Sequence, residues 1–223
     1  MRLLIFDFDG VLADSELLAN TVLADAISEL GVPTTADDSL RLYMGKRFHE
    51  IIAAVESVVG RKLPADFPNA FQQRTLARFR DELRLVDGAR AYIEAFATIP
   101  RCIASSSSPD RLSVCLDLLD LTDLFGAHVF SASLVARGKP HPDIFLHAAE
   151  QMRTDPHDAL VIEDSIGGVE AAVSAGMTVI GLLAASHIRD GHAVRLRAAG
   201  AHYVAQTFAE AERITRTLIN ANC

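Results

Sequence analysis

The sequence predicts an α/β fold in which a doubly wound, parallel-sheet core carries an inserted domain made only of helices. Two observations lead to this prediction. Short apolar runs alternate with amphipathic helical patterns over most of the 223 residues, which is the order that places helices over a parallel sheet. Residues 15–83 break this alternation with helical patterns and no convincing strand, and this stretch is too long for an ordinary connection.

Short apolar runs are expected to form the sheet. Their length and their lack of alternation are typical of parallel strands covered on both faces. The runs are residues 2–6, 102–104, 159–162, 177–182 and 202–204, with a further strand-like stretch at 128–131. Helical patterns lie between them at residues 111–119, 143–152, 166–175 and 208–219.

The inserted stretch contains its own start and stop signals. Helical patterns cover residues 16–30, 48–59 and 66–83. Gly31 and Gly60 follow the first two patterns, and glycine is the common residue just past a helix end. We therefore expect residues 15–83 to form a helical cap domain and residues 1–14 with 84–223 to form the α/β core.

Charge and composition argue against two classes of partner. The net charge is −8 and no long basic run is present, so nucleic acid binding through released counterions is not expected. The longest uncharged stretch, residues 171–186, is broken by two glycines and is too short to span a bilayer. Cys102, Cys115 and Cys223 form no CxxC pair, which favours reduced thiols and a cytoplasmic setting.

Polar side chains follow four of the expected strands. In open α/β sheets, ligands bind beyond the carboxyl ends of the strands, so we expect these side chains to meet at one edge. The segments are Asp7-Phe8-Asp9-Gly10, Ser105-Ser106-Ser107-Ser108-Pro109, Gly138-Lys139-Pro140 and Glu163-Asp164-Ser165.

These residue types together indicate phosphoryl transfer. Two carboxylates about 4 Å apart repel by about 4 kcal/mol at an effective dielectric constant near 20. A hard cation with oxygen ligands, such as Mg²⁺, offsets that repulsion. Lys139 offers a positive charge to a phosphate and Ser105 a hydroxyl. Ser108 followed by Pro109 predicts a helix start, where free N–H groups favour an anion.

The four segments resemble the four signatures of the haloacid dehalogenase superfamily. The run from Asp7 to Ser15 resembles the first signature, Ser105 the second, Lys139 in Gly-Lys-Pro-His the third, and Glu163-Asp164-Ser165 the fourth. The match covers the whole chain in the family's order. Residues 15–83 stand where the helical type 1 cap occurs in the branch that contains phosphatases and beta-phosphoglucomutase. The resemblance implies a Rossmann-like core.

The resemblance also implies how the acids divide the chemistry. Asp7 would be the nucleophile that forms an aspartyl-phosphate. Asp9 would protonate the leaving alcohol and then activate water as a base. Mg²⁺ would be bound by Asp7, by Asp164 and by the main-chain carbonyl of Asp9, and Glu163 would act through a metal-bound water.

The phosphate would be held by the remaining matched residues. Gly10 would let the chain turn sharply beside the phosphate. Ser105, Ser106 and Lys139 would bind phosphate oxygens and offset charge in the transition state.

The cap is expected to select the substrate, because a lid contacts whatever lies beyond the phosphate. Lys46 and Arg47 stand where related enzymes place a loop that reaches the site, and we expect them to bind substrate. Arg74 and Arg78 share a helical face, which is more typical of a solvated surface. We expect a small phosphorylated metabolite, such as a sugar phosphate or phosphogluconate, and a protein that is a monomer or a weak dimer.

Other functions stay open at this point. A beta-phosphoglucomutase would transfer the phosphoryl group to a sugar, but such enzymes have a histidine shortly after the first signature and residues 15–20 have none. A dehalogenase or a phosphonate-cleaving enzyme would lack Asp9. A non-catalytic binding protein would have no need to keep every polar group of the site.

Overall fold

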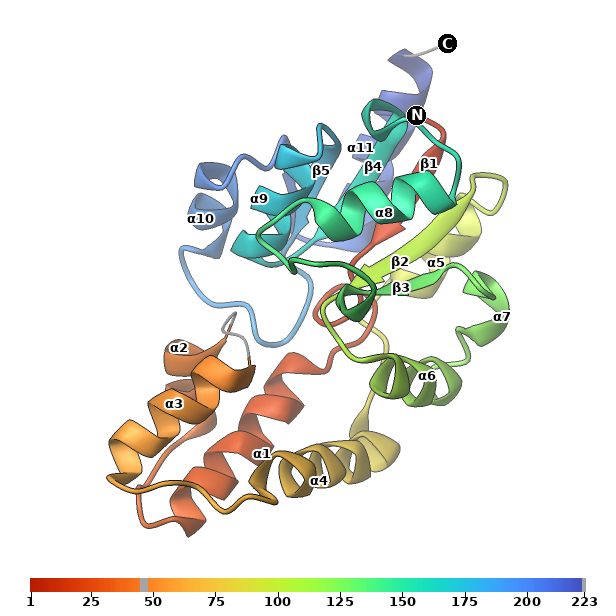
Figure 1. Ribbon diagram of the computed structural model, residues 1–223. Helices are drawn as coiled ribbons and strands as arrows, with labels where there is room; N and C mark the ends of the chain where they lie inside the picture. Colours follow the sequence, from red (N-terminus) through yellow and green to blue (C-terminus); the bar gives the residue numbers. More distant parts are fainter. Residues whose placement is uncertain (45–47, 222–223) are drawn as a thin grey trace. The chain divides into compact units, whose positions relative to one another are not determined.

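The computed structural model describes residues 1–44 and 48–221. The chain divides into two compact units, Met1–Asp14 with Arg84–Cys223 and Ser15–Leu83. Each unit has a hydrophobic core of its own, and the first unit contains all the strands described (Figure 1).

The first unit is built on a six-stranded sheet in which every pairing is parallel. The predicted α/β fold with a doubly wound sheet is therefore confirmed. The strand order is β3-β2-β1-β4-β5-β6. From β1 the chain first adds β2 and β3 on one side and then crosses to add β4, β5 and β6 on the other. Ligands bind at such a switch point, at the carboxyl ends of the strands. The strands are β1 (Leu3–Phe6), β2 (Arg101–Ser105), β3 (Val129–Ser131), β4 (Ala159–Glu163), β5 (Thr178–Leu182) and β6 (Tyr203–Ala205).

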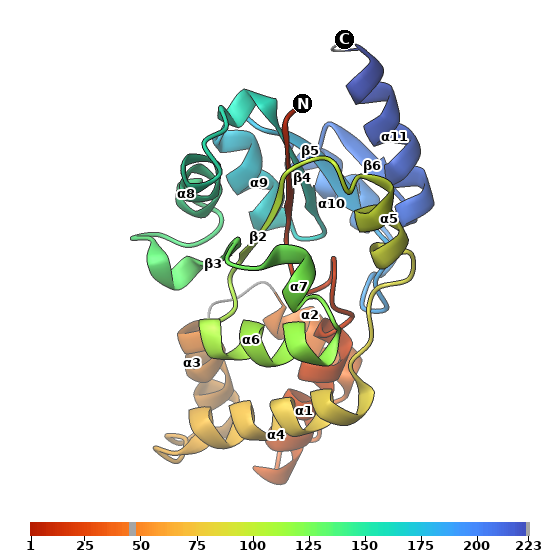
Figure 2. The ribbon, with the colours of Figure 1, turned by 90° about the vertical axis from the view of Figure 1, so that its right-hand side faces the viewer.

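Helices cover both faces of this sheet. Figure 2 shows α8 and α9 on one face and α5 and α11 on the other. None of the described helices is both long and apolar enough to cross a membrane. The helices of this unit are α5 (Ala89–Ala95), α6 (Pro109–Leu118), α7 (Thr122–Phe125), α8 (Asp143–Gln151), α9 (Ile166–Ser174), α10 (His192–Ala198) and α11 (Phe208–Ala221), with 3₁₀ turns η1 (Ala132–Leu134) and η2 (Pro156–Asp158).

Aromatic side chains fix the sheet to the helices beneath it. The Phe6 ring contacts the rings of Tyr92 and Phe125 edge-on, each with centroids 5.9 Å apart. The Tyr92 hydroxyl shares a hydrogen bond of 2.7 Å with the Thr215 hydroxyl, so its one polar atom is satisfied inside the core. Burying a side chain as large as Phe6 stabilises the fold by about 1.5–3 kcal/mol, and this packing holds the end of β1 in place.

The second unit consists of α1 (Glu16–Glu29), α2 (Ala36–Tyr43), α3 (Phe48–Val59) and α4 (Phe67–Glu82). Gly31 and Gly60 follow α1 and α3 with φ of 96° and 75°, the left-handed geometry that lets glycine end a helix. The helix α2 was not predicted. It begins with a capping box in which Thr35 and Asp38 each hydrogen-bond the other's main-chain N–H.

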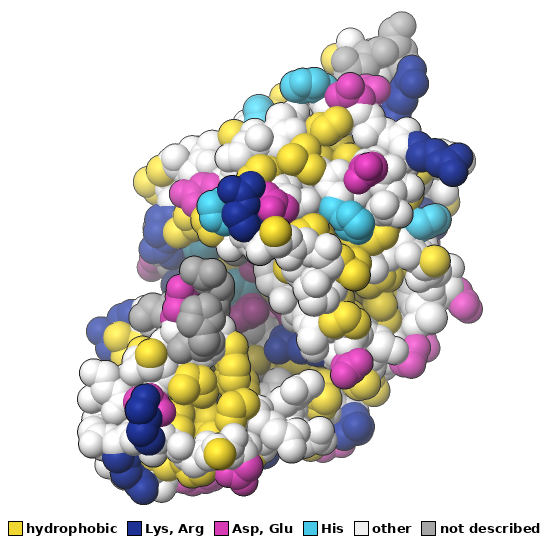
Figure 3. Space-filling model, in the orientation of Figure 1, with side chains coloured by type: hydrophobic (Ala, Val, Ile, Leu, Met, Phe, Trp, Pro, Cys, Tyr) yellow, Lys and Arg dark blue, Asp and Glu magenta, His cyan; other side chains and the backbone are white. Residues whose placement is uncertain are grey.

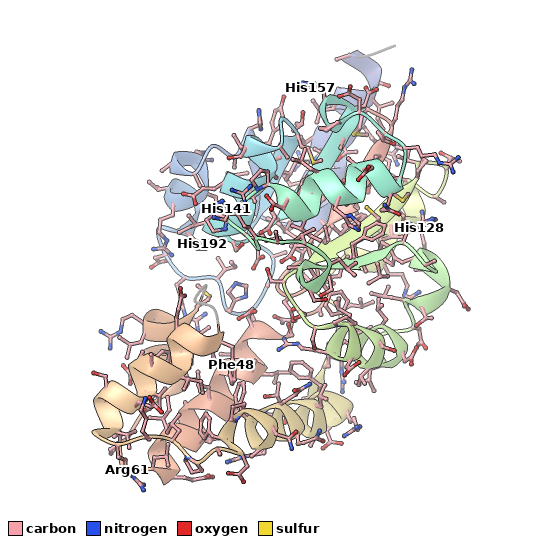
Figure 4. The ribbon with its side chains drawn as sticks, in the orientation of Figure 1. Phe48, Arg61, His128, His141, His157 and His192 are labelled. Carbon is pink, nitrogen blue, oxygen red and sulfur yellow. The ribbon has the colours of Figure 1, made fainter. Side chains whose placement is uncertain are left out.

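The surface of the helical unit combines apolar and charged side chains. Figure 3 shows apolar side chains gathered beside α3, where Phe48 (labelled in Figure 4) is 38% exposed and stacks on Phe71. Arg74 donates two hydrogen bonds, of 2.7 and 2.8 Å, to the carboxylate of Glu29. Arg78 lies 3.0 Å from the Glu82 carboxylate, so both arginines pair with acids of their own unit.

Candidate active site

The site begins where β1 and β4 end side by side. Phe6 is paired with Ile162 in the parallel ladder, and the Asp7 N–H donates to the Ile162 carbonyl at 3.0 Å. This hydrogen bond continues the ladder one residue past β1. It places the Asp7 side chain beside Glu163, the last residue of β4, and Asp164, which follows it.

Three carboxylates converge at this point. Asp7, Glu163 and Asp164 each offer an oxygen, and the three oxygens lie within 4.8 Å of one another. All three side chains are buried. Burial, followed by the charges of Glu163 and Asp164, raises the pKa of Asp7 well above its usual value. Burial and the charge of Glu163 likewise raise the pKa of Asp164.

One lysine joins two of these acids. Lys139 Nζ donates to Oδ1 of Asp7 at 2.8 Å and to Oε1 of Glu163 at 2.7 Å. Its side chain is 7% exposed, and Nζ lies 5.0 Å from the centre of the Phe145 ring. Burial alone would lower the pKa of Lys139, but the charges of Asp7 and Glu163 outweigh it and raise the pKa, which keeps this lysine charged.

The charges of this cluster fit a divalent cation. When all three carboxylates are ionised, they and the one ammonium leave two negative charges in excess, in a place sheltered from water. Ligands that are all carboxylate oxygens suit a hard cation such as Mg²⁺. Asp7, Glu163 and Asp164 are therefore the residues that could hold a metal ion.

Two glycines let these acids press against the main chain. A Cβ on Gly10, whose φ is +79°, would overlap Oδ2 of Asp164. A Cβ on Gly168, at the start of α9, would overlap Oε1 of Glu163. Gly10 was predicted as a turn residue, and the structure adds a second reason for a glycine there, namely the room that Asp164 needs.

Asp9 lies outside the group of three acids and has partners of its own. Its Oδ2 accepts from the Ser107 hydroxyl, and its Oδ1 accepts from the Arg111 guanidinium, each at 2.5 Å. Ser107 belongs to a segment expected at this edge but had no predicted role there, and Arg111 was not predicted as a site residue. The predicted helix start is confirmed, since the Ser108 side chain caps α6 and Pro109 occupies its first turn.

The serines after β2 differ in exposure. Ser105 is buried, and its Oγ accepts from the Ser107 N–H at 3.1 Å. Ser106 is exposed. Their roles as phosphate ligands stay predictions. Lys46 and Arg47 lie outside the described residues, so their role as substrate ligands stays a prediction as well.

Two histidines that were not predicted as site residues contact Asp164. His187 Nε2 lies 3.0 Å from Oδ2 of Asp164, and both side chains are buried. His192, labelled in Figure 4 at the start of α10, places Nε2 2.5 Å from the Asp164 carbonyl oxygen. No spacing pattern marks these histidines, because they follow β5 and reach Asp164 only through the fold.

The residue that caps α9 is Ser165, whose Oγ accepts from the Gly168 N–H at 3.0 Å. The Ser165 N–H donates to Oε2 of Glu163 at 2.7 Å. The Asp164 carboxylate is thus free of a capping role and turns toward Asp7 and His187.

The fold and this group of acids place the chain in a family. Residues 1–176 match the model of the haloacid dehalogenase-like hydrolases, and the chain belongs to this family, as the resemblance of its four signatures predicts. It is 28% identical to 6-phosphogluconate phosphatase of Escherichia coli K12 over 82% of each chain. It is 31% identical to phosphorylated carbohydrates phosphatase of Thermotoga maritima, over 79% of this chain and 82% of that protein.

A solved structure agrees with this placement. A conserved haloacid dehalogenase-like protein of unknown function from Agrobacterium tumefaciens strain C58 superposes with a TM-score of 0.88. The two chains are 36% identical, and the match covers 98% of this chain and 99% of that one. The likeness extends over both the sheet and the helical unit.

Proposed function

We propose that this protein is a Mg²⁺-dependent phosphatase that hydrolyses a small phosphorylated metabolite through an aspartyl-phosphate on Asp7. A sugar phosphate or the phosphate of a sugar acid is the proposed substrate. The names of the two relatives, 6-phosphogluconate phosphatase and phosphorylated carbohydrates phosphatase, support this class of substrate.

One observation carries the proposal. The Asp7 carboxylate is buried beside Glu163 and Asp164 and is bonded to a charged lysine. A purely structural cluster would gain little from three buried acids that share one cation, because each buried charge has a desolvation cost. When a cation and a phosphate complete the site, the cation offsets the excess negative charge of the carboxylates.

The proposed reaction assigns one task to each residue. An oxygen of Asp7 attacks phosphorus while Asp9 gives a proton to the departing alcohol oxygen. Ser105, Ser106 and Lys139 bind the phosphate oxygens. Mg²⁺, when bound by Asp7, Asp164 and the Asp9 carbonyl with Glu163 acting through a water, would supply positive charge next to the phosphate.

The helical unit has a part in this proposal. Residues 15–83 would act as the cap that closes over the substrate, and Lys46 and Arg47 would contact its polar groups. We place the protein in the cytoplasm because its cysteines form no CxxC pair, and we propose that it is a monomer or a weak dimer.

A screen tests the proposed function. Phosphorylated metabolites are incubated with the protein, with and without Mg²⁺, and free phosphate is measured. We expect phosphate from sugar phosphates with Mg²⁺ only, no release by Asp7→Asn, and unchanged release by Arg216→Met, a surface variant. Interconversion of sugar phosphates that depends on a bisphosphate and releases no phosphate would instead favour a mutase.

A further inference from the structure

We propose that Arg111 is a positioning residue that sets the orientation of Asp9 for proton transfer to the leaving group. This inference rests on the proposed phosphatase activity. It concerns a residue of α6 that lies outside the four signature segments that resemble the family.

The contact engages the whole carboxylate. Arg111 donates to Oδ1 of Asp9 and Ser107 donates to Oδ2, so the carboxylate is held at both oxygens. Two fixed donors define the plane of the group, whereas a single donor would let it rotate. The Arg111 and Asp9 side chains are 21% and 13% exposed, and this partial shelter strengthens a charged hydrogen bond relative to one in water.

Both donors are themselves held in place by hydrogen bonds. The Ser107 carbonyl accepts from the Ser131 hydroxyl at 2.7 Å, and the Ser107 N–H donates to Ser105 Oγ at 3.1 Å. Arg111 lies in the first turn of α6, where its N–H donates to the capping Ser108 hydroxyl at 3.4 Å. The orientation of Asp9 is therefore set by β2, β3 and α6 together.

Orientation matters because Asp9 must deliver a proton to one atom. In the first step an Asp7 oxygen forms a bond to phosphorus, the bond from phosphorus to the ester oxygen breaks, and the Asp9 carboxyl proton moves to that oxygen. The alcohol then leaves as a neutral molecule. In the second step the Asp9 carboxylate takes a proton from water, whose oxygen attacks phosphorus and releases Asp7.

The need for that proton depends on the leaving group. An alkyl alkoxide is a poor leaving group and requires the proton. The p-nitrophenolate anion is stable without one, so its departure does not require Asp9. A residue that acts only by orienting Asp9 therefore affects alkyl esters and spares this aryl ester.

The experiment compares kcat/KM for a hexitol phosphate and for p-nitrophenyl phosphate in the full-length protein with Mg²⁺. The ratio kcat/KM reports the steps up to departure of the leaving group, so hydrolysis of the aspartyl-phosphate does not enter it. We expect Arg111→Met to lower the hexitol phosphate value about 10–100-fold and to leave the p-nitrophenyl phosphate value nearly unchanged. Arg111→Lys, which keeps one charged donor, should recover part of the loss.

Two further variants sharpen the result. In an Asp9→Asn background, Arg111→Met should cause no additional loss, because the group that it positions can no longer transfer a proton. Arg216→Met on α11 should change neither ester. Equal loss on both esters, or no loss on either, would overturn the role of Arg111 while the proposed function stands. A wild-type protein that releases no phosphate from any ester would overturn both.

Discussion

Gly10 and Asp164 lie so close together that a Cβ on Gly10 would overlap Oδ2 of Asp164. The main chain of the first signature segment, at Gly10, thus packs against the carboxylate of Asp164 in the fourth. The arrangement fixes where Asp164 can point, and it leaves the acid facing Asp7.

Gly10→Ala should abolish Mg²⁺ binding. The added methyl group would displace the Asp164 carboxylate, and the φ of +79° would add about 1–2 kcal/mol of backbone strain. The measurement is calorimetric titration with Mg²⁺ together with the melting temperature. Gly31→Ala is the matched control, because its φ is +96° with nothing within 4 Å. Equal Mg²⁺ affinity in the two variants would contradict the packing argument.

His187→Ala should weaken Mg²⁺ binding about 10-fold, because a partner that orients a metal ligand contributes on that scale. The lost contact is the one from His187 Nε2 to Oδ2 of Asp164, at 3.0 Å. Calorimetry gives the dissociation constant directly, without reference to turnover. His128→Ala, at an exposed histidine, should leave the constant unchanged. An unaltered dissociation constant for Mg²⁺ in the His187 variant would show that Asp164 needs no such partner.

Stabilisation by Mg²⁺ should grow as the pH rises. The pKa values of Asp7 and Asp164 are raised above those of the unfolded chain. At a pH between the unfolded and the folded pKa of these acids, the folded protein therefore binds more protons than the unfolded chain. Without metal, the contribution of these acids to the free energy of unfolding is complete below the unfolded pKa. That contribution is lost as the pH rises through the folded pKa.

Mg²⁺ reverses this loss because it binds the ionised acids. Melting curves from about pH 5 to about pH 8, with Mg²⁺ and with EDTA, should show a gap in melting temperature that widens with pH. The Asp164→Asn variant should show a smaller gap with less dependence on pH. A wild-type gap that is constant or narrows with rising pH would contradict the coupling of metal to these acids.

Lys139→Met should destabilise the protein when no metal is present. The change leaves the Asp7 and Glu163 carboxylates buried without their shared cation, and breaking a buried ion pair costs about 3–5 kcal/mol. Urea unfolding in EDTA measures the loss, and added Mg²⁺ should restore part of it. Lys62→Met removes an ion pair at a lysine that is 89% exposed and should have little effect. Equal stability of the two variants would mean that the Lys139 contacts contribute nothing to folding.

The strands and the long helices could be predicted from the sequence because each has a regular burial pattern. The strand β4 is buried throughout, and glycines mark the ends of α1 and α3. The short helices α5 and α10 were not predicted, since seven residues carry too few apolar positions to show a helical period. The helix α2 did have a signal, in the spacing of Thr35 and Asp38.

The acids of the site could be predicted because each lies at the end of a strand or just past it, so the strand order brings them together. The structure places Asp7, Glu163, Asp164 and Lys139 in one cluster. The partners Arg111 and His187 were missed for a physical reason. Arg111 is 102 positions from Asp9, and His187 reaches Asp164 from the loop after β5, so neither contact has a local pattern.

The central claim is that Asp7 carries the phosphoryl group during turnover. The direct measurement is mass spectrometry of the Asp7 peptide, after acid quenching of the protein during turnover of a sugar phosphate with Mg²⁺. We predict the added mass of one phosphoryl group on Asp7 in the wild-type protein, and neither this mass nor free phosphate in Asp7→Asn. Full release of phosphate by the Asp7→Asn variant would contradict the claim.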